Sequence, residues 1–382
     1  MSNASRRSFF TSALTSALAS GVALKAASAA PTAAKLEMPM RTLGKTGLKV
    51  TVLGFGCMTT SDPAVITAAV NAGINYFDTA RVYQNGNNER MVGAALKDVR
   101  KKIVLATKTP AKNAKDAMAT LEMSLKELGT DYVDVWHLHS REKAADIPDE
   151  LFDVQDEAVK QGKVRFKGVS FHGGHSFMIP WLIEKKRTDV ILPSYNFTMA
   201  PEMDALIEQA SNAGLGVVAM KVMAGGFRSN KPGSSLYDRL KKETALPTAL
   251  KWAVRRPCVH TSIPGTTDLD QLDENFKAVA TGWKENDTKI LAAHLEMIRP
   301  LYCSMCGGCE GQCSKGLPVS DIIRYVSYAE GYGEFALARA NWLDMQREHQ
   351  LVRCGDCQEC TVKCPNNVRV FDRVSRAQEL FA

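Results

Sequence analysis

Apolar and polar positions in the middle of the chain alternate between two patterns. Short apolar runs occupy residues 49–56, 75–80, 102–108, 132–139, 166–172, 190–196, 216–222 and 260–265. Between them lie amphipathic segments of helical period, including residues 64–73, 88–99, 116–129, 149–162 and 202–214. Several of these segments end in glycine, a common helix stop, at Gly73, Gly129, Gly162 and Gly214. The alternation predicts a series of strand–helix units.

Eight such units between about residues 50 and 280 predict an α/β fold, a (β/α)8 TIM barrel. Strands that are buried on both faces should be as apolar as these runs. A doubly wound sheet is the competing prediction. Its dinucleotide fingerprint is incomplete, because "GFGCMT" after the first run carries two of the three glycines.

Ionisable residues stand at the predicted carboxyl ends of three neighbouring strands. Asp78 ends the second strand, with Tyr83 in the loop after it, Lys108 ends the third strand and His139 ends the fourth. Chemistry in a barrel belongs at this mouth. Tyrosine has a reference pKa of about 10, which a neighbouring ammonium lowers, and a carboxylate can hold that ammonium in place. The set predicts a proton donor for a carbonyl group that receives hydride.

The stretches "NYFDTARVY", "LATK" and "DYVDVWHLH" resemble motifs of the aldo/keto reductase superfamily over roughly residues 40–280. The resemblance implies that Tyr83 is the general acid and Lys108 its partner. It implies that Asp78 holds the lysine and that His139 orients the carbonyl. It also implies an NAD(P)H cofactor, a small carbonyl or alcohol substrate and cofactor contacts at Gly56, Met58, Ser170, Ile263, Gly265, Thr266, Thr267, Glu274 and Asn275. "KGVSFHGG", "GLGVVAMKVMAGG" and "IPGTTDLDQLDEN" are similar to the iron–sulfur branch of this superfamily.

Several positions depart from the family pattern. Phe171 and Leu192 stand where the family has carboxamide-binding Asn and Gln, and Met220 stands where an aromatic residue often stacks on nicotinamide. Gly265 and Gln271 occupy the positions of cations that hold the 2′-phosphate of NADP. NAD versus NADP therefore stays open. His137 is expected to be structural, and His172 and His175 to be either loop residues or ligand contacts.

Two cysteine runs of pattern C-x2-C-x2-C-x3-C lie near the end of the chain. This spacing resembles bacterial ferredoxins, in which the fourth cysteine of each run ligates the other 4Fe-4S cluster. It predicts two clusters, one held by Cys303, Cys306, Cys309 and Cys364, and the other by Cys354, Cys357, Cys360 and Cys313. Zinc is the alternative, although its sites need four ligands and usually show wider gaps. The remaining cysteines, Cys57 and Cys258, are expected to be buried thiols.

The N-terminal stretch "SRRSFF" resembles a twin-arginine export signal, and Ala27-Ser28-Ala29 fits a cleavage site. Export through that machinery suits a protein that folds around a cofactor first, and it predicts a periplasmic or otherwise exported location. Removal of residues 1–29 deletes three cations and no acids, so the net charge falls from +7 to +4. No basic run with interleaved aromatic residues points to nucleic acid, and no apolar stretch in the mature chain is expected to span a membrane.

The predicted organisation is a signal peptide at 1–29, a linker at 30–39, a barrel at 40–285 and a helical ferredoxin-like module at 286–382. Two functions remain open at this point. The first is an exported oxidoreductase that interconverts a carbonyl and an alcohol. The second is an iron–sulfur electron-transfer or binding protein on a barrel without catalysis, which would require a redox partner.

Overall fold

A computed structural model describes residues 37–225, 227, 235–242 and 244–382 of the chain. The predicted signal peptide at 1–29, and residues 30–36 of the predicted linker, lie outside the described residues. In the part of the chain that is described, no helix is both long and apolar enough to cross a membrane.

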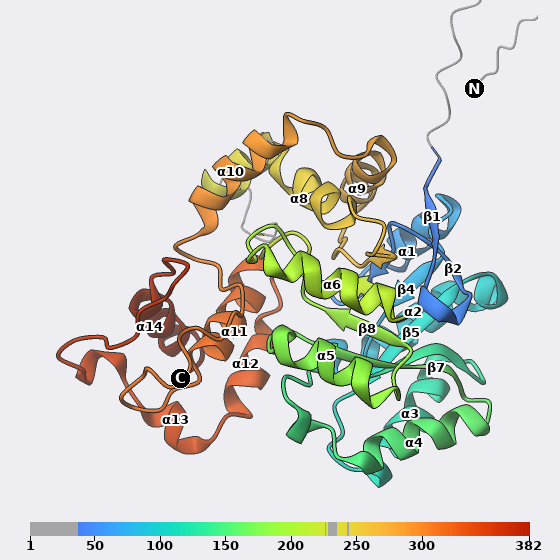
Figure 1. The fold of residues 1–382 in the computed structure, drawn as a ribbon, viewed down its shortest axis with the longest axis horizontal. Coiled ribbons are helices and arrows are strands. Elements are labelled where there is room, and N and C mark those ends of the chain that lie inside the picture. The colour runs from blue at the N-terminus through green and yellow to red at the C-terminus, as the bar shows by residue number, and fades with distance from the viewer. Residues whose placement is uncertain (1–36, 226, 228–234, 243) are drawn as a thin grey trace, which may run out of the picture. The chain divides into compact units, whose positions relative to one another are not determined.

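Eight parallel strands form a nearly closed barrel, which confirms the predicted (β/α)8 fold (Figure 1). Isolated parallel bridges from Leu53 to Ser262 and from Gly56 to Gly265 join the first strand to the last. The carboxyl ends of all strands therefore meet at one mouth. The strands are β3 (Phe55–Gly56), β4 (Tyr76–Asp78), β5 (Val104–Thr109), β6 (Val133–Leu138), β7 (Val164–Phe171), β8 (Val190–Pro193), β9 (Gly216–Ala219) and β10 (Thr261–Ser262).

The apolar run at 49–56 forms two elements and not the single strand that its pattern suggests. Strand β1 (Met40–Thr42) and strand β2 (Lys49–Thr51) make an antiparallel hairpin, and β3 begins after it. The hairpin places Leu43 and Val50 in one core cluster with the barrel residue Val218. Its turn also donates from the backbone N–H of Lys45 to the carbonyl oxygen of Gly214, just before β9, at 2.8 Å. The hairpin thus packs at the amino-terminal ends of the strands.

The predicted helices appear within about two residues of their expected bounds, because their apolar faces pack on the strands. In α3 (Ala114–Leu128), the side chain of Asn113 accepts from the backbone N–H of Asp116 at 2.9 Å, and Gly129 ends the helix at φ +63°. Leu121 and Leu125 are buried against the barrel core. The other barrel helices are α1 (Pro63–Asn71), α2 (Asn87–Leu96), α4 (Asp149–Lys160), α5 (His175–Lys185), α6 (Glu202–Asn212), α7 (Ser235–Lys242), α8 (Ala245–Val254) and α9 (Leu269–Thr281).

The C-terminal part begins with α10 (Asp287–Ile298), which packs against α8. Ile298 and Tyr302 belong to the barrel's core cluster, although the sequence analysis assigns them to the module. A second core starts after Tyr302 and gathers residues such as Ile322, Trp342 and Phe381. Its helices are α11 (Val319–Gly331), α12 (Phe335–Leu343), α13 (Arg347–Leu351) and α14 (Val370–Phe381). The C-terminal region is therefore helical, as predicted.

Candidate functional site

The structure brings the four predicted catalytic residues together at the barrel mouth. Lys108, on β5, forms a buried ion pair with Asp78, the last residue of β4. The Lys108 Nζ also donates to the carbonyl oxygen of Thr79 at 2.7 Å and lies 3.3 Å from the Tyr83 Oη. The Tyr83 and His139 rings face each other edge-on, with centroids 6.0 Å apart. The ends of three neighbouring strands, with the turn after β4, therefore place all four side chains in one site.

Burial decides the protonation state of Tyr83. It raises the pKa of Tyr83 to about 12, and the Lys108 ammonium opposes the rise. The sequence predicts a lowered pKa for Tyr83, because the Lys108 ammonium is expected beside it. The lysine does act in that direction, but desolvation of the phenolate outweighs it. Tyr83 therefore keeps its hydroxyl proton at neutral pH and is available as a donor.

The two basic side chains beside Tyr83 differ in charge, since Lys108 is a cation and His139 is neutral. Burial is the largest single effect on Lys108 and disfavours its ammonium, but the charges of Asp78 and Tyr83 and the hydrogen bonds to both together outweigh it, so the pKa of Lys108 is raised. Burial, followed by the repulsion from Lys108, holds the pKa of His139 well below its usual range. His139 is therefore a neutral imidazole, which can donate one hydrogen bond through its N–H.

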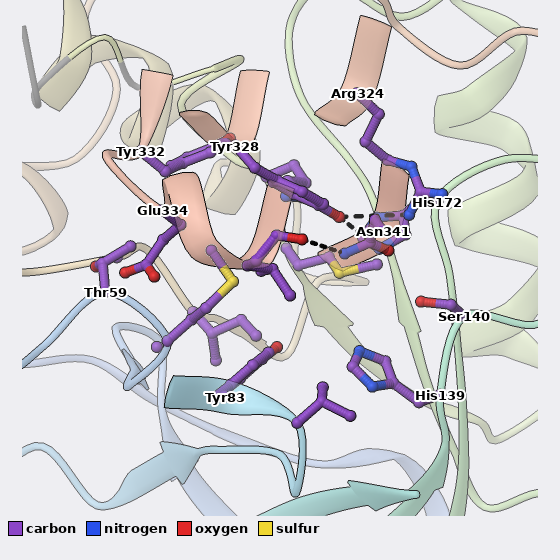
Figure 2. Close-up of a pocket in the computed structure, with 18 of the residues that line it drawn as sticks. Thr59, Tyr83, His139, Ser140, His172, Arg324, Tyr328, Tyr332, Glu334 and Asn341 are labelled. Carbon is purple, nitrogen blue, oxygen red and sulfur yellow. Dashed lines mark hydrogen bonds between the residues drawn. The ribbon is translucent and has the colours of Figure 1, made fainter. Parts of the chain in front are cut away.

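A cavity of about 700 Å³ opens above these side chains and is lined by both parts of the protein. From the barrel side, Tyr83 and His139 point into it, as Figure 2 shows. From the other side, α11 contributes Arg324 and Tyr328, and Tyr332 follows directly after its end (Figure 2). The C-terminal region therefore builds part of the wall that a substrate would contact.

The predicted cofactor contacts divide into two groups. The residues that line the cavity are Gly56, Met58, Ile263, Gly265 and Thr267. Ser170, Thr266, Glu274 and Asn275 are not among the lining residues. The Ser170 Oγ accepts from the backbone N–H of Ser140 at 3.0 Å, and the Asn275 Nδ2 donates to the Thr266 Oγ1 at 3.2 Å. The hydrogen bonds of these side chains thus hold protein loops together.

The positions that depart from the family pattern differ in their surroundings. Phe171 is fully buried between the barrel and its helices, and Leu192 is fully buried inside the barrel. Met220 lines the cavity. Gln271 also lines it, and its Nε2 donates to the Thr267 Oγ1 and the Asp268 Oδ2, each at 2.8 Å. Neither buried side chain could supply the missing amide groups.

The histidines and cysteines outside the main site also differ from one another. His137 is fully buried, and a Cβ on Gly168 would lie only 2.3 Å from its Nδ1, so the glycine makes room for the ring. His175 lies 3.1 Å from the Ser194 Oγ, whereas His172 lines the cavity. Among the two cysteines outside the runs, Cys57 is buried and Cys258 is only half-buried.

The cysteines of the two runs are grouped crosswise. The Cys303 thiol interacts electrostatically with those of Cys306, Cys309 and Cys364, and burial raises its pKa to about 12. In the same way, the Cys354 thiol interacts with those of Cys313, Cys357 and Cys360. Each group thus takes its fourth member from the other run.

The surroundings of the first group fit a cluster. The backbone N–H of Met305 points at the Cys303 Sγ at 3.4 Å, and the Asn366 Nδ2 points at the Cys306 Sγ at 3.3 Å. Such donors stabilise sulfur that carries negative charge. All ten cysteines are free thiols, and in the described residues no three His, Cys, Asp or Glu side chains lie close enough to share one metal ion. The C-x2-C-x2-C-x3-C spacing of both runs is the ground for preferring clusters to a single zinc ion.

Sequence reasoning missed Arg324, Lys221 and Tyr332 as residues of the site. A signal existed in "RYVSY", since Arg324 and Tyr328 are four residues apart and therefore share one face of α11. The pattern does not say that this face meets the barrel.

Comparisons with known proteins agree with this geometry. A model of the aldo/keto reductase family matches residues 58–296, and a model of the 4Fe-4S dicluster domain matches residues 299–368. The uncharacterised oxidoreductase YqkF of Bacillus subtilis is 28% identical over 304 residues, covering 67% of this chain and 96% of its own length. L-galactose dehydrogenase of Arabidopsis thaliana is 25% identical over 311 residues, covering 69% of this chain and 97% of its own.

Among solved structures, the holo form of the aldo-keto reductase AKR11C1 from Bacillus halodurans superimposes with a TM-score of 0.58 at 27% identity. The match covers 67% of this chain and 96% of that protein. The matched region of each relative is thus nearly its whole length, whereas about a third of this chain lies outside each match. The chain belongs to the aldo/keto reductase family and is an oxidoreductase of that type with an added 4Fe-4S dicluster domain.

Proposed function

We propose that the protein interconverts a carbonyl compound and an alcohol, using a bound nicotinamide cofactor. One observation carries this proposal: the Lys108 Nζ, paired with Asp78, lies 3.3 Å from the Tyr83 Oη at the wall of the cavity. A protonated phenol beside a fixed ammonium is a proton donor whose conjugate base is stabilised as it forms.

The residues of the chain divide the reaction between them. The reduced nicotinamide, when bound, supplies hydride to the carbonyl carbon. The Tyr83 Oη donates its proton to the carbonyl oxygen, on which negative charge develops. The His139 N–H orients that oxygen by a hydrogen bond, and its neutrality avoids a further charge in the site. Asp78 keeps the Lys108 ammonium in position and charged, so that it can stabilise the Tyr83 phenolate.

The cofactor would lie along the cavity wall formed by Gly56, Met58 and Ile263, with Gly265 and Thr267 further along. A 2′-phosphate at Gln271 would meet an uncharged amide that is already bonded to the Asp268 carboxylate at 2.8 Å. That carboxylate repels a phosphate. We therefore expect NAD(H) to bind as well as NADP(H) or better.

We propose that the two crosswise cysteine groups hold two 4Fe-4S clusters. The first group lies close to the barrel mouth, because a Cβ on Gly173 would lie 3.2 Å from the carbonyl oxygen of Met305, between Cys303 and Cys306. The end of α11 packs on the barrel loops even more closely, since a Cβ on Gly331 would lie 2.2 Å from the carbonyl oxygen of Gly225. A cluster that folds the module would therefore also complete the cavity.

An electron-transfer function is the second candidate. It is favoured by the burial of Phe171 and Leu192 at positions where the family pattern has amide groups, because the nicotinamide would lose two hydrogen-bond partners there. Single-electron exchange by the clusters would then replace hydride transfer, with a redox partner outside the chain.

We further propose export by the twin-arginine machinery to the periplasm or beyond. The support is the "SRRSFF" stretch with its Ala-Ser-Ala site, together with cysteines arranged for clusters that assemble in a reducing compartment.

The test of the carbonyl chemistry is the substitution Tyr83→Phe, which removes one hydroxyl and keeps the ring. Reduction of aromatic aldehydes should fall by at least about a thousandfold, while cofactor affinity stays within about twofold of wild type. Tyr132→Phe, which alters a tyrosine that packs under Arg100 away from the cavity, is the matched control and should keep its rate.

Retention of most of the turnover by Tyr83→Phe would show that Tyr83 is not the general acid. Absence of any aldehyde reduction and of nicotinamide binding in the wild type would favour the electron-transfer candidate.

A further inference from the structure

Helix α11 brings a guanidinium group to the cavity from the opposite side to Tyr83. Arg324 lines the cavity beside His172, facing the region of Ser140 and His139 (Figure 2). Its positive charge reaches the reacting centre, since it contributes to the lowered pKa of His139. A ligand whose carbonyl lies between Tyr83 and His139 would therefore have Arg324 near its far end.

Most of the hydrogen-bonding capacity of Arg324 is free. Its Nη2 donates to the Asp321 Oδ1 at 2.7 Å and its Nη1 to the Tyr328 Oη at 3.3 Å. A guanidinium carries five N–H donors, so three have no partner among the described residues, and the buried Nε–H is one of them. A planar group with free donors is suited to bind a carboxylate or phosphate in bidentate fashion.

A lysine of the same cavity wall, Lys221, packs on the tyrosine that Arg324 also approaches, Tyr328. The Lys221 Nζ, from the loop after β9, lies 4.1 Å from the Tyr328 ring centroid and 4.6 Å from that of Tyr332. Across the described residues, no carboxylate lies within ion-pair distance of it. Burial, followed by the repulsion from Arg324, holds the pKa of Lys221 well below its usual range. An anion bound near both side chains would oppose the burial of the Lys221 ammonium and its repulsion by Arg324.

Asp321 pairs with Arg324 and the charge of Glu142 also stabilises its guanidinium, whereas the other nearby carboxylates have other partners or lie elsewhere. Asp78 pairs with Lys108, and the Glu142 carboxylate accepts from the backbone N–H groups of His172 and Gly173. Glu334 lies across the cavity near Thr59 (Figure 2). No carboxylate of the described chain pairs with Lys221, whose lowered pKa favours the neutral amine, so an anion bound beside it would favour its protonated form.

We propose that Arg324 and Lys221 form an anion-binding subsite for a carboxylate or phosphate group of the ligand. The inference rests on the proposed function, and it deepens that function by naming a substrate class: small carbonyl compounds that carry an acidic group, such as oxo acids. The same chemistry has a second source, the diphosphate of the nicotinamide cofactor. Because Arg324 and His139 line the same cavity on either side of Ser140 (Figure 2), the substrate is the source that the geometry favours.

The test is calorimetric titration of the anaerobically purified, cluster-loaded protein with three probes. Phenylglyoxylate is an oxo acid, its methyl ester is the uncharged analogue, and inorganic diphosphate represents the cofactor. The variants are Arg324→Gln and Lys221→Met, with Arg324→Lys as a charge-conserving variant. The matched control is Arg376→Gln, which also breaks an arginine–carboxylate pair, here with Glu330 at 2.8 Å, but on the half-exposed side of α14.

The expected result is preferential binding of phenylglyoxylate over its ester by wild type. Arg324→Gln and Lys221→Met should each weaken the acid about tenfold to a hundredfold and leave the ester unchanged. Arg324→Lys should recover part of the loss, and Arg376→Gln should bind like wild type. If the variants weaken diphosphate and not the oxo acid, the subsite exists and belongs to the cofactor.

Two outcomes overturn the inference. One is that neither anion binds wild type more tightly than the ester, and the other is that the variants, with cluster absorbance intact, bind both anions like wild type. These measurements need no turnover. Failure of the proposed reductase function therefore appears in the aldehyde assay, whereas failure of the subsite appears in the titrations.

Discussion

Replacement of Lys108 by methionine tests whether the ion pair at the barrel mouth is as strongly buried as the structure describes. Lys108 and Asp78 are each about 1% exposed. The substitution keeps most of the side chain's volume and removes the ammonium that neutralises Asp78. A buried carboxylate is then left with one of its oxygens, Oδ2, already lacking a hydrogen-bond partner in the described structure.

The size of the effect follows from desolvation. Removal of one partner of a buried pair typically costs about 3–5 kcal/mol in the free energy of unfolding. The double variant Asp78→Leu/Lys108→Met removes both charges and should recover much of that loss, because a well-packed apolar pair can replace a buried ion pair at little cost. Lys277→Met is the matched control. Its pair with Asp273 is 2.6 Å long but about 60% exposed on both sides, so we expect a loss of about 0.5 kcal/mol or less.

The loss should also depend on pH. Burial raises the pKa of Asp78, and the Lys108 charge, which opposes the rise, is absent in Lys108→Met. A carboxyl group with a raised folded-state pKa binds its proton more tightly in the folded protein. The free energy of unfolding of Lys108→Met is therefore highest below the unfolded-state pKa of about 3.9. It falls as the pH rises through the folded-state pKa of Asp78.

The assay is urea denaturation under anaerobic conditions, with tryptophan fluorescence for the barrel and cluster absorbance for the module followed separately. Trp136, which is fully buried on β6, reports on the barrel. A loss below about 1 kcal/mol in Lys108→Met, with no dependence on pH, would refute the reasoning. It would mean that water reaches Asp78 in solution.

Three further predictions concern the other parts of the chain. Cys364→Ser should remove iron from the cluster of the first run, and not from that of its own, as measured by iron content and electron paramagnetic resonance of the two clusters. Replacement of Arg6 and Arg7 by lysine should leave a cluster-loaded precursor in the cytoplasm, and normal export in a fractionation assay would contradict the twin-arginine route. Calorimetry should give NAD(H) an affinity at least equal to that of NADP(H), and Gln271→Arg should shift the preference towards NADP(H) about tenfold or more. A hundredfold preference of wild type for NADP(H) would point to another phosphate anchor.

Much of the fold and part of the site could be predicted from local patterns. Residues 116–129 have a helical apolar period and a stop glycine, and the structure has a helix there. Asp78, Lys108 and His139 stand at the ends of consecutive apolar runs, and parallel strands bring such positions to one edge. The spacing within the two cysteine runs also predicts that the fourth cysteine of each run groups with the first three of the other. These features depend on neighbours within a few residues, or on a repeat, so they can be read along the chain.

Other features depend on contacts between distant segments, which no local pattern encodes. The sequence predicts a helical C-terminal module, but not that Arg324 of α11 and Lys221 of the loop after β9 would line one cavity at the barrel mouth. The split of the run at 49–56 follows from the hairpin packing at the barrel's base. The pKa of Tyr83 is the clearest case. The residue types indicate a neighbouring cation, whereas the amount of water excluded by the surrounding elements decides that burial outweighs it.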